Sequence, residues 1–348
     1  MRAASDDVRV IDGAERLSTE YQTFLLDQFG VLHDGKRAYP GARECVRALW
    51  QNGAKLWIIS NSSRRTDGTV SKLEKLGFES RWFAGAMTSG EVTHGFLTRT
   101  ARRVVGRAKR EDAAFDEMDA SSEALRTVAA AMKRGMESRV GRRAKCAHVT
   151  WNERGAITLG EEFNEWIEIV DETSEDFDFV LIHGTEAFGR GDDRDCVSVD
   201  VQRVKEFIER VAREGAAPLV IANPDFVTVS GDALVTMPGT LGKWYAEARG
   251  TATAEGMVAL MGKPDAIIYK TLLGKIGRES GAVIAVGDSM EHDVAGARRA
   301  GIDTLFICGG IHATELSDGN DGVDEAALRA LYDAHDSTPR YASWRLEW

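Results

Sequence analysis

The 348-residue sequence lacks the features of a membrane protein and of a disulfide-stabilised protein. No apolar run approaches the roughly 18 residues of a transmembrane helix, and the longest runs, such as 216–222, have the length of a strand. The first twenty residues are acidic and contain no apolar stretch, so no secretory signal is visible. The four cysteines lie far apart and form no CxxC pair, which predicts free thiols in a reducing compartment. We expect a cytoplasmic protein, with an organelle as the alternative location.

Positive charge is also scarce, because 44 Lys and Arg face 55 Asp and Glu for a net charge of −11. That balance argues against a protein that coats nucleic acid or an anionic membrane. The stretch 99–145 has the opposite sign, with thirteen basic and seven acidic residues. We expect a surface insertion there, helical or partly disordered. The alternative is a basic rim that attracts anionic substrates.

Apolar runs of strand length alternate with helical patterns along much of the chain. Helices are expected at 41–52 and 293–300, the second closed by Gly301 as a C-terminal cap. Unbroken apolar strands that alternate with helices predict an α/β domain with a buried parallel sheet. The four strand-like runs are Phe24–Leu26, Leu56–Ile59, Val283–Val286 and Thr304–Cys308.

A polar residue lies at the carboxyl end of three of these strands, namely Asp27, Ser60 and Asp288. Ligands of parallel α/β sheets bind at that edge. A single Asp or Ser after a strand is usually a helix N-cap, but three together indicate a site. Two converging carboxylates repel each other unless a cation lies between them, and hard oxygen ligands suit Mg²⁺.

The other polar residues near these strand ends suit a phosphoryl group. Ser60 and Asn61 lie on a turn that offers side-chain and backbone donors to an anion. Lys263 supplies the point charge that commonly pairs with phosphate. An aspartate held against phosphorus can act as a nucleophile and form an aspartyl phosphate. The set therefore indicates Mg²⁺-assisted phosphoryl transfer, most simply hydrolysis.

Four short motifs in this order resemble those of the haloacid dehalogenase (HAD) superfamily. The resemblance is to its subfamily IIA, which includes pyridoxal phosphate, phosphoglycolate and nucleotide phosphatases. It covers residues 20–97 and 235–312 and implies a Rossmann-like parallel-sheet core with an inserted α/β cap domain. The motifs are Asp27-Gln28-Phe29-Gly30-Val31, Ile58-Ile59-Ser60-Asn61, Gly262-Lys263-Pro264, and Gly287-Asp288 through Asp293.

The resemblance implies a role for each motif residue. Asp27 would be the nucleophile and a Mg²⁺ ligand, together with the backbone carbonyl of Phe29 and the carboxylate of Asp288. Asp293 would orient the metal ligands without being a direct ligand itself. The alternative for Asp293 is an ordinary charge on the surface of a helix.

The remaining motif residues would act on the substrate. Ser60 and Asn61 would hold the phosphoryl oxygens, and Lys263 would neutralise charge between Asp27 and the substrate. A solvated loop lysine is the alternative for Lys263. The expected substrate is a small phosphorylated metabolite, and the expected activity is that of a phosphoric monoester hydrolase.

One position departs from the family pattern. Phosphatases of the superfamily carry a second aspartate two residues after the nucleophile, which protonates the leaving group, and this sequence has Phe29 there. General acid–base catalysis is worth about 10²–10⁴-fold. The protein could act on a good leaving group, could use His33 or Asp34 instead, or could be an impaired binding protein. A dehalogenase-type hydrolase also fits an aromatic residue here, but the intact Gly287-Asp288 and Asp293 argue against it.

Lys263 lies 203 positions after Ser60, and this gap requires a second domain. We expect a core at 1–88 and 241–348 and a cap at 89–240, with strands at 146–151, 179–183 and 218–222 and a helix at 201–214.

Two cap turns correspond to substrate-specificity loops of the family. They present Thr185 and Glu186 in one loop and Asn223 and Asp225 in the other. Turn chemistry alone also explains Asn-Pro-Asp, and His183 could be a satisfied strand-end histidine. Nearby, Asp192, Asp193 and Asp195 suggest a solvated acidic loop. At the C-terminus, the two tryptophans of 341–348 suggest docked packing. A homodimer is compatible with the sequence.

Overall fold

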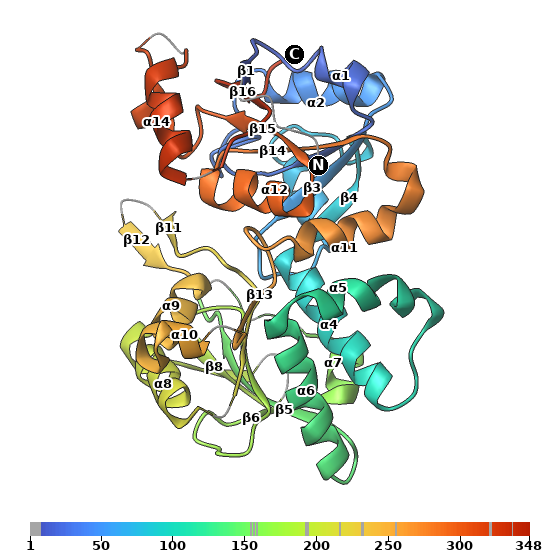
Figure 1. Ribbon diagram of the computed structural model, residues 1–348, viewed down its shortest axis with the longest axis vertical. Helices are drawn as coiled ribbons and strands as arrows, with labels where there is room; N and C mark the ends of the chain where they lie inside the picture. The colour runs from blue at the N-terminus through green and yellow to red at the C-terminus, as the bar shows by residue number, and fades with distance from the viewer. Residues whose placement is uncertain are drawn as a thin grey trace. The chain divides into compact units, whose positions relative to one another are not determined.

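The computed structural model describes residues 8–153, 155, 157, 159–191, 195–215, 217–230, 233–254, 256–319, 322–335 and 337–348. The chain divides into two compact units (Figure 1). The first, here the core unit, comprises the residues up to Ser60 together with Thr66–Met87 and Lys263–Trp348. The second, the inserted unit, comprises Asn61–Arg65 and Thr88–Gly262.

A seven-stranded sheet forms the centre of the core unit, in the order β1-β16-β15-β14-β2-β3-β4. Neighbouring strands from β1 through to β3 pair in parallel. The predicted α/β fold with a buried parallel sheet is thereby confirmed. The strands are β1 (Arg9–Val10), β2 (Thr23–Leu26), β3 (Lys55–Ser60), β4 (Phe83–Thr88), β14 (Val283–Gly287), β15 (Asp303–Ile307) and β16 (Tyr341–Ser343).

Helices cover both faces of this sheet, with α2 and α12 on opposite sides (Figure 1). The α-helices of the core unit are α1 (Leu17–Glu20), α2 (Ala42–Gln51), α3 (Thr69–Glu74), α11 (Ile267–Ile276), α12 (Ala295–Ala300), α13 (Ala313–Leu316) and α14 (Glu325–His335). Short 3-10 turns form at η1 (Ser80–Trp82) and η3 (Gly277–Ser280). The predicted helix at 293–300 instead opens with a π-helical turn, η4 (Met290–Val294). Gly301 ends α12 with φ +74°, as expected of a C-terminal cap.

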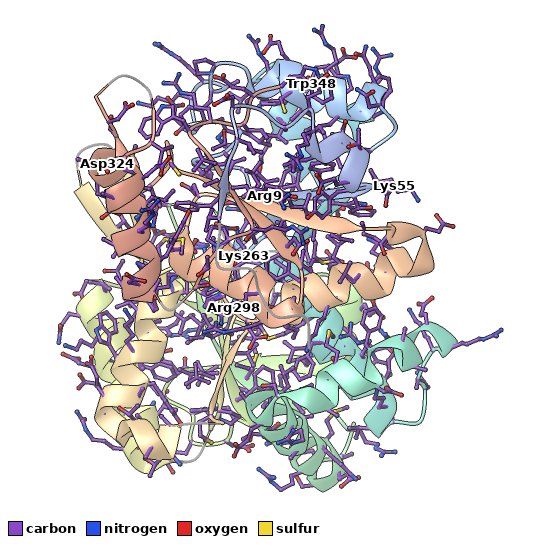
Figure 2. The ribbon with its side chains drawn as sticks, turned by 45° about the horizontal axis from the view of Figure 1, so that its top comes forward. Arg9, Lys55, Lys263, Arg298, Asp324 and Trp348 are labelled. Carbon is purple, nitrogen blue, oxygen red and sulfur yellow. The ribbon has the colours of Figure 1, made fainter. Side chains whose placement is uncertain are left out.

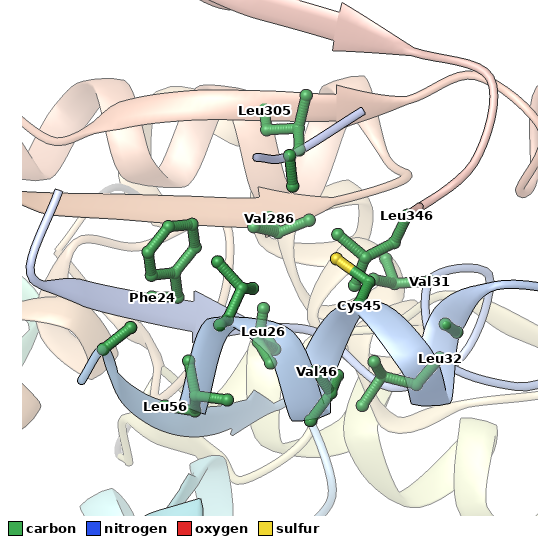
Figure 3. Close-up of a cluster of buried hydrophobic side chains, with 14 of the residues drawn as sticks. Phe24, Leu26, Val31, Leu32, Cys45, Val46, Leu56, Val286, Leu305 and Leu346 are labelled. Atoms are coloured by element: carbon green, nitrogen blue, oxygen red, sulfur yellow. The ribbon is translucent and has the colours of Figure 1, made fainter. Parts of the chain in front are cut away.

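Apolar side chains on one face of the sheet pack against α2 (Figure 3). Phe24 and Leu26 of β2 meet Cys45 and Val46 of α2, and all four are fully buried. The alternation along the strands sends the intervening residues to the opposite face, where Phe306 packs with the helices that follow β14 and β15. The core sheet thus has an apolar cluster on each of its two faces.

The C-terminal segment completes the core sheet. Strand β16 lies between β1 and β15 and is fully buried, and Leu346 is buried beyond it. The backbone N–H of Ala14 donates to the carbonyl of Glu347, which ties the last residues to the start of the chain. Of the two tryptophans predicted to dock, Trp344 is partly buried against an apolar cluster of the core unit, whereas Trp348 is 40% exposed.

A second sheet organises the inserted unit, in the order β13-β10-β7-β5-β8-β9, with β6 paired to β5. Its strands are β5 (Ala144–Thr150), β6 (Ile167–Val170), β7 (Phe179–Ile182), β8 (Ala187–Arg190), β9 (Asp195–Ser198), β10 (Leu219–Ile221) and β13 (Val258–Leu260), with β11 (Val227–Ser230) and β12 (Ala233–Thr236) in a separate antiparallel pair. Its helices are α4 (Ser89–Val104), η2 (Arg110–Phe115), α5 (Asp116–Ser121), α6 (Glu123–Ser138), α7 (Glu161–Trp166), α8 (Val201–Glu214), α9 (Pro238–Arg249) and α10 (Thr251–Ala254).

The second domain boundary differs from the expected one. Residues 241–262, expected in the core, belong to the inserted unit. The reason is that β13 pairs in parallel with β10 and extends the second sheet. On α9, Leu241 and Tyr245 are fully buried in the apolar cluster of the same unit. The chain therefore leaves the inserted unit at Gly262, one residue before Lys263.

The basic stretch 99–145 is helical, but it is not the surface insertion that composition suggests. Arg99 and Arg102 are only 5% and 8% exposed. Arg102 forms a bidentate salt bridge with Asp112, with N–O distances of 2.6 and 3.1 Å, and also pairs with Glu162. The segment is partly buried because acids within it and beside it neutralise its arginines. Helix α6 also packs an apolar face into the inserted unit.

No helix in the described part of the chain is long and apolar enough to cross a membrane. All four cysteines are free thiols, and Cys45, Cys146 and Cys308 are buried.

Two arginines of the basic stretch give a matched test of this packing. Arg102→Ala leaves Asp112 buried without its partner and should lower the free energy of unfolding by about 3–5 kcal/mol. Arg107→Ala removes an exposed pair with Glu165 and should cost about 1 kcal/mol or less. Urea unfolding of both variants measures the difference. Equal small effects would show that the network does not hold the unit together.

Candidate active site

Strand register brings three polar residues to one edge of the core sheet. Leu26, at the end of β2, lies opposite Val286 on one side and Ile58 on the other. Asp27, Asp288 and Ser60 therefore follow at nearly the same level, where the three neighbouring strands end. The amide of Asp27 still donates to the carbonyl of Val286. The predicted convergence of strand ends thus follows directly from the pairing.

Three carboxylates gather at this edge. Oxygen atoms of Asp27, Asp288 and Asp293 all lie within 4.8 Å of one another. Asp288 and Asp293 are 7% and 2% exposed, and Asp27 is partly buried. The ligand set consists of hard carboxylate oxygens, which matches the preference of Mg²⁺ and Ca²⁺.

One buried lysine pairs with two of these acids. The Nζ of Lys263, labelled in Figure 2, lies 2.9 Å from Asp27 Oδ1 and 2.8 Å from Asp293 Oδ1. Burial alone would lower the pKa of Lys263, but the two carboxylates raise it well above its ordinary value. The alternative of a solvated loop lysine is wrong, because the side chain is only 3% exposed.

The charges of this cluster are not balanced by the protein alone. Burial raises the pKa of Asp27 to about 7 against the opposing effect of Lys263. Burial, reinforced by Asp293 and Asp27, raises the pKa of Asp288 to about 8. Three acids with one ammonium group leave room for two further positive charges, so the donor set fits a divalent cation.

Glycines allow these acids to approach the backbone. A Cβ at Gly30, whose φ is +76°, or at Gly310 would overlap the Asp288 carboxylate, and one at Gly287 would overlap Asp293. The N–H of Ile311 donates to Asp288 Oδ2 at 2.8 Å. Gly310 lies outside the four motifs, and the sequence signal for it is a glycine in a loop that follows a strand end.

Phe29 is an exposed aromatic residue beside the acids. Its side chain is 61% exposed, and its ring meets the edge of the His33 ring at a centroid distance of 4.7 Å. His33 is buried, its Nδ1 accepts the N–H of Gly35 at 3.0 Å, and burial lowers its pKa. Asp34 accepts two backbone N–H groups, which lower its pKa. Neither geometry suits a proton donor to a leaving group.

Asn61 has a different set of partners from the one expected. Its Nδ2 donates to Asp225 Oδ1 at 2.8 Å, and its Oδ1 accepts from Ser89 at 3.3 Å. Asp225 in turn receives support from Asn223, whose Oδ1 accepts the Asp225 N–H at 2.9 Å. A Cβ at Gly262 would overlap both Ser89 and Asn61. We name Asn61, Ser89, Asp225 and Gly262 the hinge cluster, because it joins the chain's first entry into the inserted unit to its final exit.

The other predicted specificity loop is held by its own contacts. Thr185 donates to the carbonyl of Thr236 at 3.2 Å, and the Glu186 carboxylate accepts the N–H groups of Asn152 and Glu153. His183 is buried with its Nδ1 3.1 Å from Nε2 of His148, which agrees with the alternative of a satisfied strand-end histidine. In the expected acidic loop, Asp195 begins β9, whereas Asp192 and Asp193 lie outside the described residues.

Sequence comparisons agree with the four motifs. The family described as haloacid dehalogenase-like hydrolase matches residues 24–139, and a second HAD-hydrolase-like family matches residues 260–332. A glycerol-3-phosphate phosphatase of Homo sapiens is 40% identical over 81 residues, which cover 22% of this chain and 25% of that protein. The match thus spans about a quarter of that relative. Chronophin of Bos taurus is 24% identical over 92% of this chain and 89% of its own length.

Solved structures share the fold. A haloacid dehalogenase-like hydrolase from Brucella suis has a TM-score of 0.62 at 20% identity and covers 97% of this chain and 100% of its own. A glycerol phosphate phosphatase of Mycobacterium tuberculosis, solved in complex with magnesium, has a TM-score of 0.51 at 17% identity and covers 87% and 73%. A parallel α/β core that gathers three acids and a lysine at one edge is the arrangement that the motifs imply. The chain belongs to the haloacid dehalogenase-like hydrolases.

The hinge cluster can be tested by a double-mutant cycle on Asn61 and Asp225. Asn61→Ala and Asp225→Ala should each lower the free energy of unfolding by about 1.5–3 kcal/mol, the range for a hydrogen bond to a charged group. The double variant should fall short of the sum by about 1 kcal/mol or more. As a control, Arg213→Ala, on an exposed face of α8, should add to Asn61→Ala without coupling. Additivity of the first pair would contradict the contact.

Proposed function

We propose that the protein is a divalent-cation-dependent phosphatase of small phosphate monoesters that uses Asp27 as its nucleophile. The observation that carries the proposal is the position of Asp27 at a strand end, paired with a buried Lys263 and adjacent to two further carboxylates. The names of the relatives support it, since a glycerol-3-phosphate phosphatase and a dihydroxyacetone phosphatase are among them.

The proposed reaction uses residues of the core unit. A carboxylate oxygen of Asp27 attacks phosphorus, and the bond from phosphorus to the ester oxygen breaks with its electron pair on the leaving group. Water then attacks phosphorus, which releases inorganic phosphate and restores the Asp27 carboxylate. Lys263 holds Asp27 in place and offsets negative charge, while Ser60 donates to the phosphoryl group.

We propose that the carboxylates of Asp27 and Asp288 and the carbonyl of Phe29 bind the cation, with Mg²⁺ as the preferred ion. When bound, Mg²⁺ supplies positive charge that offsets the phosphoryl oxygens. Asp293 acts as a positioning residue, because its oxygens accept from Lys263 Nζ and from the N–H of Ser289. It orients the lysine and the turn that carries Asp288.

The inserted unit is proposed to select the substrate. Its two turns, with Thr185 and Glu186 in one and Asn223 and Asp225 in the other, are fixed by hydrogen bonds within the unit. Their shape rather than free side chains would then discriminate between substrates. Asn61, engaged with Asp225, would contribute its backbone to phosphate binding and its side chain to the hinge cluster.

A binding protein without turnover is the second candidate, and the exposed Phe29 favours it. The two candidates separate in a hydrolysis assay with a panel of phosphate esters, with and without Mg²⁺. The phosphatase proposal expects Mg²⁺-dependent release of phosphate that Asp27→Asn reduces by at least about 10³-fold, since the covalent step is lost. Asp333→Asn, an exposed acid on α14, should leave activity unchanged. Activity that survives Asp27→Asn would contradict the phospho-aspartate route.

Cation binding should also change stability in a pH-dependent way. Asp27 and Asp288 have pKa values raised from 3.8 to about 7 and about 8, so folding without metal favours their protonated forms. The stability this gives is present at acid pH and is lost as the pH rises from 3.8 through about 7 to 8. A cation needs the ionised forms. Mg²⁺ should therefore raise Tm strongly at pH 8 and little at pH 5.5.

The matched variant for this measurement is Asp288→Asn, which keeps the shape of the side chain and removes its charge. It should abolish the Mg²⁺-induced rise in Tm at pH 8. A rise of equal size at both pH values, or one that persists in Asp288→Asn, would show that the cation binds elsewhere.

A further inference from the structure

A phosphatase that uses a carboxylate nucleophile must also expel the leaving-group oxygen. An alkoxide leaves with difficulty unless a neighbouring group gives it a proton, and such help is worth about 10²–10⁴-fold. A phenolate or another stabilised anion leaves without that help. The supply of protons near Asp27 therefore decides which esters the enzyme can cleave.

The turn that follows Asp27 provides no suitable donor among its described residues. Phe29, two residues on, has no proton to give. The Asp34 carboxylate accepts two amides and has a lowered pKa, so it stays ionised. His33 is buried against the Phe29 ring, and its Nδ1 accepts the N–H of Gly35 at 3.0 Å. Burial and Asp288 raise the pKa of Tyr39, which makes it a weaker acid than a free phenol.

The ionic cluster itself does not fill this role. The Nζ of Lys263 is buried and held by Asp27 Oδ1 at 2.9 Å and by Asp293 Oδ1 at 2.8 Å, so it is directed at these carboxylates. Asp293 accepts from Lys263 and from the amide of Ser289. Asp27 is the proposed nucleophile, and Asp288, a proposed cation ligand, accepts the N–H of Ile311 through Oδ2 at 2.8 Å. Each of these groups has another task in the proposed reaction.

Apolar side chains take the place of a proton donor beside the acids. Phe29 is 61% and Ile311 is 73% exposed, which places them among the few large apolar side chains that the described chain exposes. Both adjoin Asp288: Gly30, the neighbour of Phe29, lies against its carboxylate, and the Ile311 amide binds it. An aromatic leaving group would gain contact area on such surfaces.

From these contacts we infer that the enzyme acts on aryl phosphates, whose leaving group departs as a stabilised phenolate, in preference to alkyl phosphates. The inference rests on the proposed function and specifies its substrate class. In the step concerned, the bond from Asp27 to phosphorus forms as the bond from phosphorus to the phenolic oxygen breaks. The phenolate leaves with the electron pair and takes its proton from water.

A leaving-group series tests the inference. Wild-type kcat/KM is measured with Mg²⁺ for phenyl phosphates whose phenols have pKa values from about 7 to about 10, and for glycerol phosphate. We expect log kcat/KM to fall steeply with leaving-group pKa, and glycerol phosphate to be at least about 10²-fold slower than 4-nitrophenyl phosphate. A flat series, or glycerol phosphate cleaved as fast as the aryl esters, would overturn the inference.

Variants at Phe29 distinguish the effect of a missing proton donor from the effect of the aromatic ring on substrate binding. Phe29→Asp introduces a donor, so it should flatten the slope and raise the rate on glycerol phosphate. Phe29→Leu removes the ring without adding a proton, so the steep slope should remain while KM for aryl esters rises. Val10→Ala, an exposed apolar residue on β1, is the control and should change neither quantity. A slope in Phe29→Asp as steep as that of wild type would contradict the account.

One histidine on the turn after Asp288 requires its own variant. His292 has Nδ1 3.2 Å from Ser289 Oγ, and His292→Gln should leave the slope unchanged. A steeper slope in His292→Gln would identify it as the proton donor and overturn the inference. Different results overturn the proposed function and the inferred substrate class. Turnover that depends on Asp27 but shows a flat slope overturns only the substrate class. No turnover of any aryl ester by folded wild type with Mg²⁺ overturns both.

Discussion

Three carboxylates, two of them buried and one partly buried, gather near a single ammonium group at the carboxyl edge of the core sheet, and this imbalance of charge constrains the structure around it. Lys263 lies within 3 Å of Asp27 and Asp293 at once, yet the pKa values of Asp27 and Asp288 stay raised to about 7 and about 8. Burying unpaired charge is costly. A fold that keeps such a cluster without compensation is arranged to receive positive charge from outside, as a divalent cation would supply it.

The parallel sheet and its glycines build this cluster from parts of the chain that are far apart. Register places the ends of β2, β3 and β14 side by side, and Gly30, Gly287 and Gly310 let the backbone approach the acids. The chain leaves the inserted unit at Gly262, directly before Lys263. The first entry into that unit directly follows Ser60, and the hinge cluster of Asn61, Ser89, Asp225 and Gly262 joins this entry to the exit within the inserted unit.

Much of the fold and of the ionic cluster could be predicted from the sequence, because strand-length apolar runs and the polar residues that end them are local signals. The same signals predicted α8 with its observed bounds. Side-chain partners distant in sequence left no such signal. The bond from Asn61 to Asp225 spans 164 residues, and the burial of Arg102 depends on Asp112 and Glu162. The boundary near 240 was misplaced because β13 is a short strand whose partner, β10, lies elsewhere in the chain.

The most direct test of the account is to trap the covalent intermediate on Asp27. Wild-type enzyme turning over 4-nitrophenyl phosphate with Mg²⁺ is quenched in acid, digested, and its peptides are examined by mass spectrometry. The account predicts a phosphoryl group on the peptide that contains Asp27, and none on that peptide from Asp27→Asn. Steady turnover with a phosphoryl group on another residue, or with none on any peptide under conditions that give a burst of 4-nitrophenol, would contradict it.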